Sequence, residues 1–270
     1  MPDHENPTVP APAEAPRPGD TYVQSFARGL QVIRSFSAQA PQQTLSEVAQ
    51  RTGLTRAGAR RILLTLEGLG YVRSNGRQFS LAPRILDLGF AYLSSLPLWN
   101  LAEPVMERLV EDVKESCSAA VLDGADVVYV LRIPTHKIMS INLGIGSRLP
   151  AYCTSMGRTL LAELDGRTLD QLLQDVPPVR RTERTIVDTA ALKEQLVKVR
   201  EQGWCLVDQE LEEGLVSLSA PIRDRAGRAI AAMNISGQVN RTSPAYMVEN
   251  FLPKLRAAAQ DISRMLQHKS

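Results

Sequence analysis

Apolar residues recur with helical spacing in three consecutive segments near the N-terminus. In FARGLQVIRSFS they stand at Phe26, Leu30, Ile33 and Phe36, three or four positions apart, which predicts an amphipathic helix. The next segment, TLSEVAQRTG, opens with the Thr-x-x-Glu signature of a capping box and ends at a glycine, a common helix stop. The buried side expected for this second helix consists of Leu45, Val48 and Ala49.

A third helix follows after a three-residue turn, and it carries a cluster of arginines. Thr55 can cap this helix. Its expected inward-facing positions are Ala59, Ile62, Leu63, Leu66 and Leu69. The outer side then holds Arg56, Arg60 and Arg61. Because Arg56 and Arg60 are one turn apart, their like charges destabilise an isolated helix by about 0.2–0.5 kcal/mol. The pattern therefore indicates a helix-turn-helix whose second helix has an anionic partner.

The segment GYVRSNGRQFSLAP predicts a β-hairpin directly after the third helix. A strand starts at Tyr71, and the Asn-Gly dipeptide at 75–76 is the strongest short signal for a hairpin turn. Apolar residues resume after it. The hairpin resembles a small wing, with Arg73 and Arg77 on either side of its tip.

The remaining pattern predicts a linker helix and then a mixed helical and extended region. PRILDLGFAYLSSL starts with Pro83 at a favoured first-turn position and carries more apolar surface than one small domain needs. Further helices are expected in NLAEPVMERLVEDVKES, TSMGRTLLAEL, ALKEQLVKVREQG and NFLPKLRAAAQDISRML, and extended stretches in SAAVLDGADVVYVLRI, KIMSINLGIGSRLP, WCLVDQELEEGLVSLSAPI and AIAAMNISG. This succession predicts an α+β fold for the larger C-terminal part.

Charge is distributed unevenly along the chain. The 270 residues carry 31 Lys and Arg against 29 Asp and Glu, a net charge of +2. Residues 1–20 are Pro-rich and acidic, which predicts a disordered tail. Residues 21–82 hold eight arginines and two glutamates, a net charge of +6, whereas the remaining 188 residues hold 22 basic and 23 acidic groups. A solvated basic surface is the plainer alternative, but basic charge on a winged helix-turn-helix predicts DNA binding.

The phosphates and base edges of a DNA major groove are then the expected anionic partner. Arginine binds guanine through two parallel hydrogen bonds, and it also neutralises phosphates. By position, we expect Thr55, Arg56 and Arg60 in the groove, and Arg28, Arg73 and Arg77 on the phosphates. The full set of expected DNA-binding residues is Arg28, Thr44, Thr55, Arg56, Arg60, Arg61, Arg73 and Arg77.

Several segments together resemble transcriptional regulators of the isocitrate lyase regulator (IclR) family. They are SFARGLQVIRSF, TLSEVAQRTGLTRAGARRILLTLEGLGYV, RLPAYCTSMGRTLLA and ISGQVNR. GSRLPAYCTSMGR is most similar to the subgroup that controls the breakdown of protocatechuate and related aromatic acids, the PcaR, PcaU and PobR types. The resemblance implies an N-terminal winged helix-turn-helix, a linker helix and a C-terminal GAF-like α/β effector-binding domain. The expected boundaries are a tail at 1–20, the winged domain at 21–82, the linker at 83–97 and the effector domain at 98–270.

The resemblance also implies where an effector binds. In the family it lies between the loop that starts the TSMGRTLLAEL helix and the sheet. The residues carried over are Ile138, Ile141, Leu149, Ser155, Met156, Asp208, Leu215, Ser217, Asn234 and Ser236. Backbone N–H groups at a helix start can hold an anion, so we expect the acid near Ser155 and Met156. Met156 and Leu215 could equally be core residues, and Arg148 and Arg158 could pair with a carboxylate or serve the structure.

Patterns for catalysis or cofactor binding are weak. His136 would have to be the base of a Ser-His-Asp constellation, but no G-x-S-x-G elbow accompanies it. The acidic run DQELEEG lacks histidine partners for a metal site. The GIG at 144–146 precedes Ser-Arg-Leu-Pro instead of a helix, so it is not a phosphate loop. We expect no enzyme activity, no cofactor and no metal.

The cysteines and the apolar runs of the sequence indicate the compartment in which the protein is found. Cys117, Cys153 and Cys205 are far apart, which favours reduced thiols over a disulfide framework. No apolar run approaches the roughly 18 residues of a membrane span, and no leader pattern is present, so a cytoplasmic protein that does not enter membranes is expected.

One winged unit buries only a modest interface with DNA, so we expect a homodimer that forms through the N-terminal and linker helices. The family resemblance implies tetramers as pairs of dimers.

The sequence therefore predicts a DNA-binding transcriptional regulator controlled by a small organic acid of the protocatechuate/β-ketoadipate pathway. One alternative is an IclR-type regulator of another carboxylate pathway, with a glyoxylate- or pyruvate-like effector. Another is an enzyme or transport-associated sensor with an incidental helix-turn-helix. The pattern does not separate repressor from activator, because both need the same groove contacts.

Overall fold

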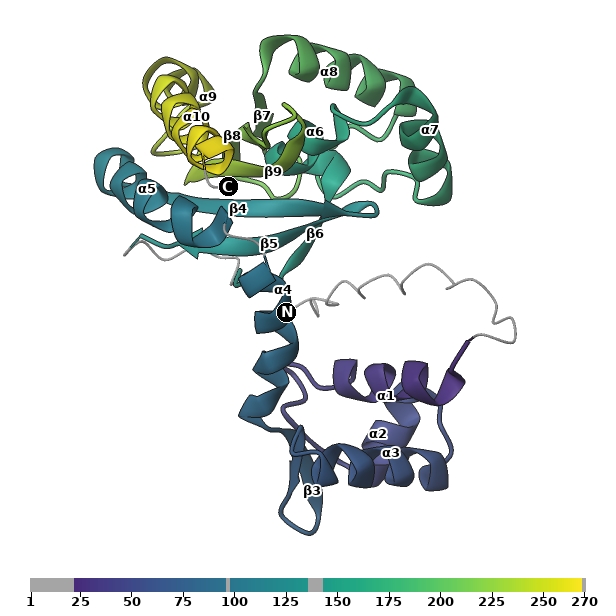
Figure 1. Cartoon of the computed structure of the whole chain (residues 1–270). Coiled ribbons are helices and arrows are strands. Elements are labelled where there is room, and N and C mark those ends of the chain that lie inside the picture. The colour runs from purple at the N-terminus through teal and green to yellow at the C-terminus, as the bar shows by residue number, and fades with distance from the viewer. Residues whose placement is uncertain (1–21, 96–97, 136–142, 269–270) are drawn as a thin grey trace. The chain divides into compact units, whose positions relative to one another are not determined.

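The structure, a computed structural model, describes residues 22–95, 98–135 and 143–268. The chain divides after Tyr92 into two compact units (Figure 1). The predicted tail at 1–20 lies outside the described residues. Within the described ranges, no helix has both the length and the apolar composition needed to cross a membrane.

The N-terminal unit contains a helix-turn-helix followed by a hairpin. Its elements are α1 (Gln24–Arg34), β1 (Gln42–Thr44), α2 (Leu45–Thr52), α3 (Arg56–Gly68), β2 (Val72–Ser74) and β3 (Gln78–Leu81). Thr44 and Glu47 form the predicted capping box at the start of α2, and Gly53 ends that helix with a φ of +64°. The strand β1 pairs antiparallel with β3. This third strand was not predicted, because three residues are too few to show an alternating pattern.

The core of this unit lies between its three helices and β2. Its buried members are Val32, Phe36, Val48, Ala49, Ala59, Leu63, Leu66 and Val72. The prediction that Leu69 faces inward was wrong, because this residue follows the last turn of α3 as its C-cap and is exposed. Part of the predicted apolar stripe of α1 also faces outward, and Phe26 is 68% exposed. The N-terminal unit therefore has an exposed apolar surface that includes Phe26 and Leu69.

A helical connection follows the wing. A single 3₁₀ turn, Pro83–Ile85, leads into α4 (Leu86–Ser95). Pro83 occupies the first position of the turn, as predicted. Residues 96–97 of the expected linker lie outside the described residues, and α5 (Leu98–Val113) begins after them.

The C-terminal unit is built on an antiparallel sheet of six strands, ordered β6-β5-β4-β9-β8-β7. The strands are β4 (Ser116–Asp123), β5 (Asp126–Ile133), β6 (Arg148–Pro150), β7 (Cys205–Asp208), β8 (Leu215–Arg223) and β9 (Ala229–Gln238). The predicted Asp-Gly turn joins β4 to β5, with Gly124 at a φ of +60°. Because β9 pairs with both β4 and β8, it joins the two halves of the sheet.

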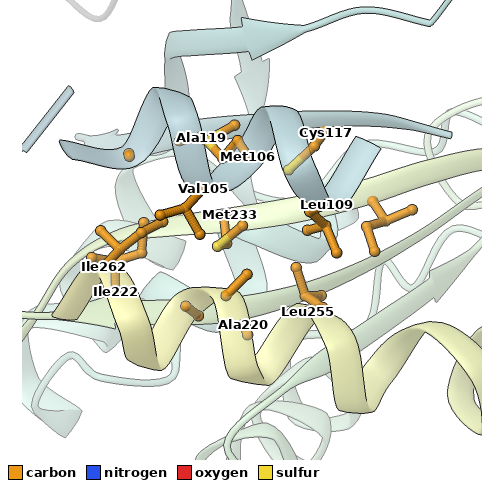
Figure 2. Close-up of a cluster of buried hydrophobic side chains, with 14 of the residues drawn as sticks. Val105, Met106, Leu109, Cys117, Ala119, Ala220, Ile222, Met233, Leu255 and Ile262 are labelled. Atoms are coloured by element: carbon orange, nitrogen blue, oxygen red, sulfur yellow. The ribbon is translucent and has the colours of Figure 1, made fainter. Parts of the chain in front are cut away.

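Helices cover both faces of this sheet. On one face, Met106 of α5 and Leu255 of α10 (Leu252–His268) pack around Met233 of β9 (Figure 2). The other face carries α6 (Ser155–Leu161), α7 (Gly166–Asp175) and α8 (Thr189–Gln202) (Figure 1). A short α9 (Pro244–Tyr246) and a π-helical turn, Met247–Phe251, precede α10. The helix α7 was not predicted. The architecture confirms the predicted fold class, a winged helix-turn-helix and a linker helix before an α/β domain.

Candidate functional site

Helix α3 presents a row of basic side chains. The Thr55 hydroxyl accepts a hydrogen bond from the Gly58 N–H (3.1 Å), which satisfies one of the first-turn amides and starts the helix at the next residue. Arg56 and Arg60 stand one turn apart on the exposed side, with Arg61 beside them. Their exposure agrees with the expected recognition helix, and their contact with DNA stays a prediction.

The β2–β3 hairpin carries two more exposed arginines. Asn75 Oδ1 accepts the N–H groups of Arg77 (3.1 Å) and Gln78 (2.8 Å), which closes the turn at the wing tip. Arg73 and Arg77 are exposed on this hairpin, as is Arg28 on α1. The expected DNA-binding arginines thus lie on α1, on α3 and on the wing of one unit.

Thr44 has a structural task of its own. Its hydroxyl donates to Glu47 Oε2 (2.8 Å) and accepts from the Glu47 N–H (3.4 Å), while its own N–H donates to the same carboxylate (2.7 Å). The hydrogen bond from the Thr44 N–H, together with that from its hydroxyl, lowers the pKa of Glu47. The Thr44 hydroxyl is therefore committed to the capping box, and a contact with DNA remains a prediction.

In the C-terminal unit, hydroxyl, amide and guanidinium side chains line up across the sheet. The strand register places Arg132 of β5 opposite Ser118 of β4, and Ser118 opposite Asn234 of β9. Directly opposed residues point to the same face, so these three side chains share it. Ser236 lies two residues beyond Asn234 and opposes Ser217 of β8, which extends the polar area on that face.

A β-bulge in β5 decides which of its side chains reach this face. The register with β4 shifts between Ala119 and Ala120, and Ala120 pairs with Tyr129. Val130 is left as the extra residue and packs in the core of the opposite face. Strict alternation would put Tyr129 and Arg132, three positions apart, on opposite faces. The bulge brings both to the same one.

Asn234 organises a cluster of hydroxyl groups on this face. Its Oδ1 accepts the Ser118 N–H (3.1 Å), and since that backbone group can only donate, the amide Nδ2 faces the other way. Nδ2 donates to the Oγ atoms of Ser217 and Ser236, both at 2.9 Å. Ser217 Oγ lies 2.8 Å from Ser155 Oγ of α6. Because the two serine oxygens accept from Asn234, their protons can point along the cluster or toward a ligand.

The cluster borders a narrow cavity between the sheet, the start of α6 and the β7–β8 connection. Among the expected effector residues, the structure brings together Leu149, Ser155, Met156, Leu215, Ser217, Asn234 and Ser236. The cavity is also lined by residues that the sequence did not single out: Tyr129, Arg132, Leu143, Cys153, Thr154, Val207 and Leu211. Its volume is about 30 Å³, room for one or two water molecules.

Of the expected effector residues that the structure describes, only Asp208 is not part of this lining. Ile138 and Ile141 lie outside the described residues. Asp208 ends β7, but its carboxylate pairs with Arg184 and accepts a hydrogen bond from Gln209 Nε2 (3.1 Å). The expectation that Asp208 contacts the effector therefore has no support in this arrangement, because a neighbouring guanidinium occupies the carboxylate.

Two arginines that could have bound an acid are engaged by carboxylates of the protein. Both terminal nitrogens of Arg158 donate to Glu210 (2.6 and 2.5 Å), and both side chains are buried. Arg148 bonds Asp123 (2.6 Å) and Asp126 (3.1 Å) at an exposed edge of the sheet. The sequence left two roles open for Arg148 and Arg158, binding of an acid or a structural contact. In the structure both make structural contacts with carboxylates of the protein.

The Arg158–Glu210 pair also fixes the β7–β8 connection beside the cavity. The Glu210 carboxylate accepts the Ile186 N–H (3.0 Å), and its backbone carbonyl accepts the Thr185 hydroxyl (2.7 Å). Leu211, the next residue, lines the cavity. A buried, two-pronged ion pair with further hydrogen bonds is a rigid arrangement, so this wall is held in place.

The start of α6 is already capped by the protein itself. The Thr154 hydroxyl accepts the Gly157 N–H (3.3 Å), and the helix has only seven residues, all buried. A Cβ at Gly157 would overlap the Ala151 carbonyl oxygen, so the glycine lets α6 pack closely on the preceding turn. The helix start brings Ser155 to the cavity, but with one first-turn amide occupied it is a weaker anion site than the sequence suggested.

Burial keeps the Cys153 thiol and the Tyr129 phenol, which both border the cavity, neutral. It raises the pKa of Cys153 to about 11, which makes an unreactive thiol at neutral pH. It also raises the pKa of Tyr129 to about 12, while the charge of Arg132 opposes the rise. The described residues contain no group of three His, Cys, Asp or Glu side chains that could hold a metal ion.

Both units match models of one protein family. The IclR helix-turn-helix domain matches residues 25–76, and the C-terminal domain of bacterial transcriptional regulators of the IclR type matches residues 90–264. The chain belongs to the IclR family. The Pca regulon regulatory protein of Pseudomonas putida is 44% identical over 246 residues, which cover 91% of this chain and 84% of that protein.

Solved structures agree with this IclR-family assignment. The crystal structure of a protein from Rhodococcus sp. RHA1 is 51% identical, with a TM-score of 0.82, and covers 91% of this chain and 98% of its own. An IclR homologue from Microbacterium hydrocarbonoxydans, solved with 4-hydroxybenzoate, is 26% identical, with a TM-score of 0.81, and covers 91% and 100%. The predicted family and the predicted closeness to Pca-type regulators are confirmed.

Proposed function

We propose that this IclR-family regulator controls transcription in response to an aromatic hydroxy acid of the protocatechuate type. The N-terminal unit binds operator DNA, with α3 in the major groove and the wing on the backbone. The C-terminal unit binds the acid in the cavity beside α6. The identity with the Pca regulon regulatory protein and the likeness to the homologue solved with 4-hydroxybenzoate support this class of effector. The proposal needs no catalytic step or cofactor, and it places the protein in the cytoplasm with the DNA.

The observation that carries this proposal is a hydrogen-bonding cluster in a cavity that also has apolar walls. Ser155, Ser217 and the Asn234 amide can meet the oxygen substituents of a ring, while Leu149 and Leu215 offer apolar walls for its faces. A glyoxylate- or pyruvate-like acid has at most one methyl group to cover those walls. The ring-opened β-ketoadipate would bring a second negative charge to neutral hydroxyl groups. We therefore favour the aromatic acid.

Binding of such an acid requires the cavity to open. A volume of about 30 Å³ holds water but no aromatic ring. The wall at Leu211 is tied to Arg158 through Glu210, so the acid must displace other parts of the lining. The closed and open arrangements then differ in their affinity for the acid, which is what control by an effector requires.

We also propose that the regulator acts as a homodimer, with tetramers as pairs of dimers. A groove of about 870 Å³ runs between α1 and α3, and its apolar lining includes Phe26, Leu30 and Leu69, together with Leu88 of α4. Exposed apolar surface of this extent marks an interaction site. The same face of a second copy would cover it in a two-fold dimer, which also places two recognition helices on two half-sites.

Titration calorimetry with a panel of acids tests the effector class. The panel holds protocatechuate, 4-hydroxybenzoate, β-ketoadipate, glyoxylate and pyruvate, and we expect the two aromatic acids to bind most tightly. Ser217→Ala and Asn234→Ala should weaken that binding roughly tenfold or more, because an unpaired buried polar group costs about 1–3 kcal/mol. Gln171→Ala, on the exposed side of α7, is the control.

Two results would contradict this proposal. Binding of glyoxylate, pyruvate or β-ketoadipate alone would show that the effector class is wrong. Unchanged aromatic-acid affinity in both Ser217→Ala and Asn234→Ala would show that the acid binds elsewhere.

A further inference from the structure

We infer that Tyr129 is a specificity-determining residue whose hydroxyl donates a hydrogen bond to the carboxylate of the acid. The ring hydroxyl of the acid then lies at the opposite end of the cavity, on the serine cluster, which consists of Ser155, Ser217 and Ser236. The inference rests on the proposed aromatic-acid effector, because it assigns the two ends of that acid within the same cavity.

The Tyr129 hydroxyl has no hydrogen-bond partner in the described part of the protein. Tyr129 is 5% exposed and lines the cavity. Its pKa responds to burial and to the charge of Arg132, with no hydrogen bond to the phenol among the causes. The other polar side chains of the described lining all have partners within the protein. A nearly buried hydroxyl that lines a cavity without a partner indicates that a group entering the cavity meets it.

The strand register places Tyr129 on the face of the sheet that carries the serine cluster. Tyr129 opposes Ala120 of β4, and Ala120 opposes Ala232 of β9. Asn234 lies two residues beyond Ala232, so its side chain shares that face. Because β4 lies between β5 and β9, the backbones of Tyr129 and Asn234 are separated by two strand spacings, about 10 Å across the sheet. A ring with polar groups at opposite ends can therefore reach both.

The hydrogen bonds of the serine cluster leave one hydroxyl proton for a ligand. A hydroxyl oxygen accepts two hydrogen bonds, and Ser217 Oγ already accepts one from Asn234 Nδ2 (2.9 Å). Only one of its serine neighbours, Ser155 (2.8 Å) or Ser236 (3.0 Å), can therefore donate to it. The other serine keeps its proton, for which the described residues offer no further acceptor. The cluster can thus both donate and accept, which matches the hydroxyl of a ring.

The carboxylate belongs at the Tyr129 end because a carboxylate accepts hydrogen bonds and cannot donate them. Burial raises the pKa of Tyr129 to about 12, so the phenol keeps its proton at neutral pH and can donate it in a charge-assisted bond. The charge of Arg132 opposes that rise, so the potential that it produces at the phenol favours an anion. Arg132 has interactions of its own within the protein, and we assign it no contact with the acid.

Titration calorimetry with three ligands tests this orientation. 4-Hydroxybenzoate carries both polar groups, benzoate lacks the ring hydroxyl, and 4-methylphenol lacks the carboxylate. Tyr129→Phe should weaken binding of both acids about tenfold or more, because a charge-assisted hydrogen bond is lost, and should leave 4-methylphenol binding unchanged. Ser217→Ala should weaken binding of 4-hydroxybenzoate and 4-methylphenol and spare benzoate. Tyr246→Phe, which removes an exposed phenol hydroxyl outside the cavity, is the matched control and should leave all three affinities unchanged.

Tyr129→Phe should fold as wild type by circular dichroism, because the hydroxyl has no partner to lose among the described residues. If it does not, Tyr129→Leu, which also lacks the hydroxyl, takes its place. Unchanged 4-hydroxybenzoate affinity overturns the inference and leaves the proposed function standing. Equal losses for all three ligands would show that the substitution only reshapes the cavity, and a loss confined to the two ligands with a ring hydroxyl would reverse the orientation; either result also overturns the inference. A wild-type protein that binds neither acid overturns the proposed function as well.

Discussion

The arginines of this regulator have different tasks, and their surroundings distinguish them. Arg158 is buried against Glu210, where removal of one partner would leave an uncompensated charge. Arg148 is exposed and bonded to two aspartates, an arrangement that contributes little to stability. Arg56 and Arg60 are exposed on one helix, and within the described part of the chain neither forms a salt bridge with an acidic side chain. Phosphates and base edges of DNA are the partners that best explain such a pair.

Substitution of either recognition-helix arginine should weaken operator binding and leave the fold intact. A two-pronged arginine contact with guanine contributes about 1–3 kcal/mol of base discrimination, whereas loss of a solvated side chain changes the free energy of unfolding by less than about 0.5 kcal/mol. Fluorescence anisotropy of Arg56→Ala and Arg60→Ala on operator and random duplexes, at one salt concentration, measures the effect. Arg225→Ala, exposed in the turn between β8 and β9, is the control. Operator affinity equal to wild type in both variants would show that α3 does not read the DNA.

Residue types at the cavity could be predicted only where a family pattern names them. Ser155, Ser217 and Asn234 were expected from the resemblance, and the structure joins them in one hydrogen-bonded cluster. Tyr129 and Arg132 were missed because a regular strand would separate them, and nothing in DVVYVLRI marks Val130 as the bulged residue. The pairing of Glu210 with Arg158 joins residues 52 positions apart, a separation that no local pattern reveals.

At the scale of elements, local chemistry predicted the boundaries best. The Thr44 capping box, the Gly53 helix end and the Asn-Gly wing turn all depend on neighbouring residues, and the structure shows each of them. β1 was missed because it exists only through pairing with β3, which is a tertiary contact. The apolar faces of α1 and α4 were predicted as patterns, but their exposure became visible only in the structure. These faces suit a second copy of the chain.

Charges placed on these faces should dissociate the proposed dimer. Phe26 of α1 and Phe90 of α4 are 68% and 67% exposed, so Phe26→Glu and Phe90→Glu should fold but resist burial, because an unpaired charge is costly to bury. Light scattering at micromolar concentration should give a dimer or tetramer for wild type and smaller species for the variants. Val197→Glu, on the exposed side of α8, should behave as wild type. A monomeric wild-type protein, with and without DNA, would contradict the proposal.

At the scale of the whole molecule, the account depends on coupling between two sites in different units. The proposed acid site lies in the C-terminal unit and the expected DNA-binding arginines lie in the N-terminal unit. The cavity has to open for an acid, and the open arrangement must differ from the closed one in its affinity for DNA. Coupling of this kind is reciprocal, because the operator must then change the affinity for the acid by the same factor.

The most direct measurement follows this reciprocity with the full-length protein. Operator affinity is measured with and without saturating protocatechuate, and protocatechuate affinity with and without saturating operator, at one salt concentration. The account predicts that operator affinity and protocatechuate affinity change by the same factor, in the range of about 5- to 150-fold that is typical of allosteric coupling. An acid that binds the protein but leaves operator affinity unchanged would contradict it.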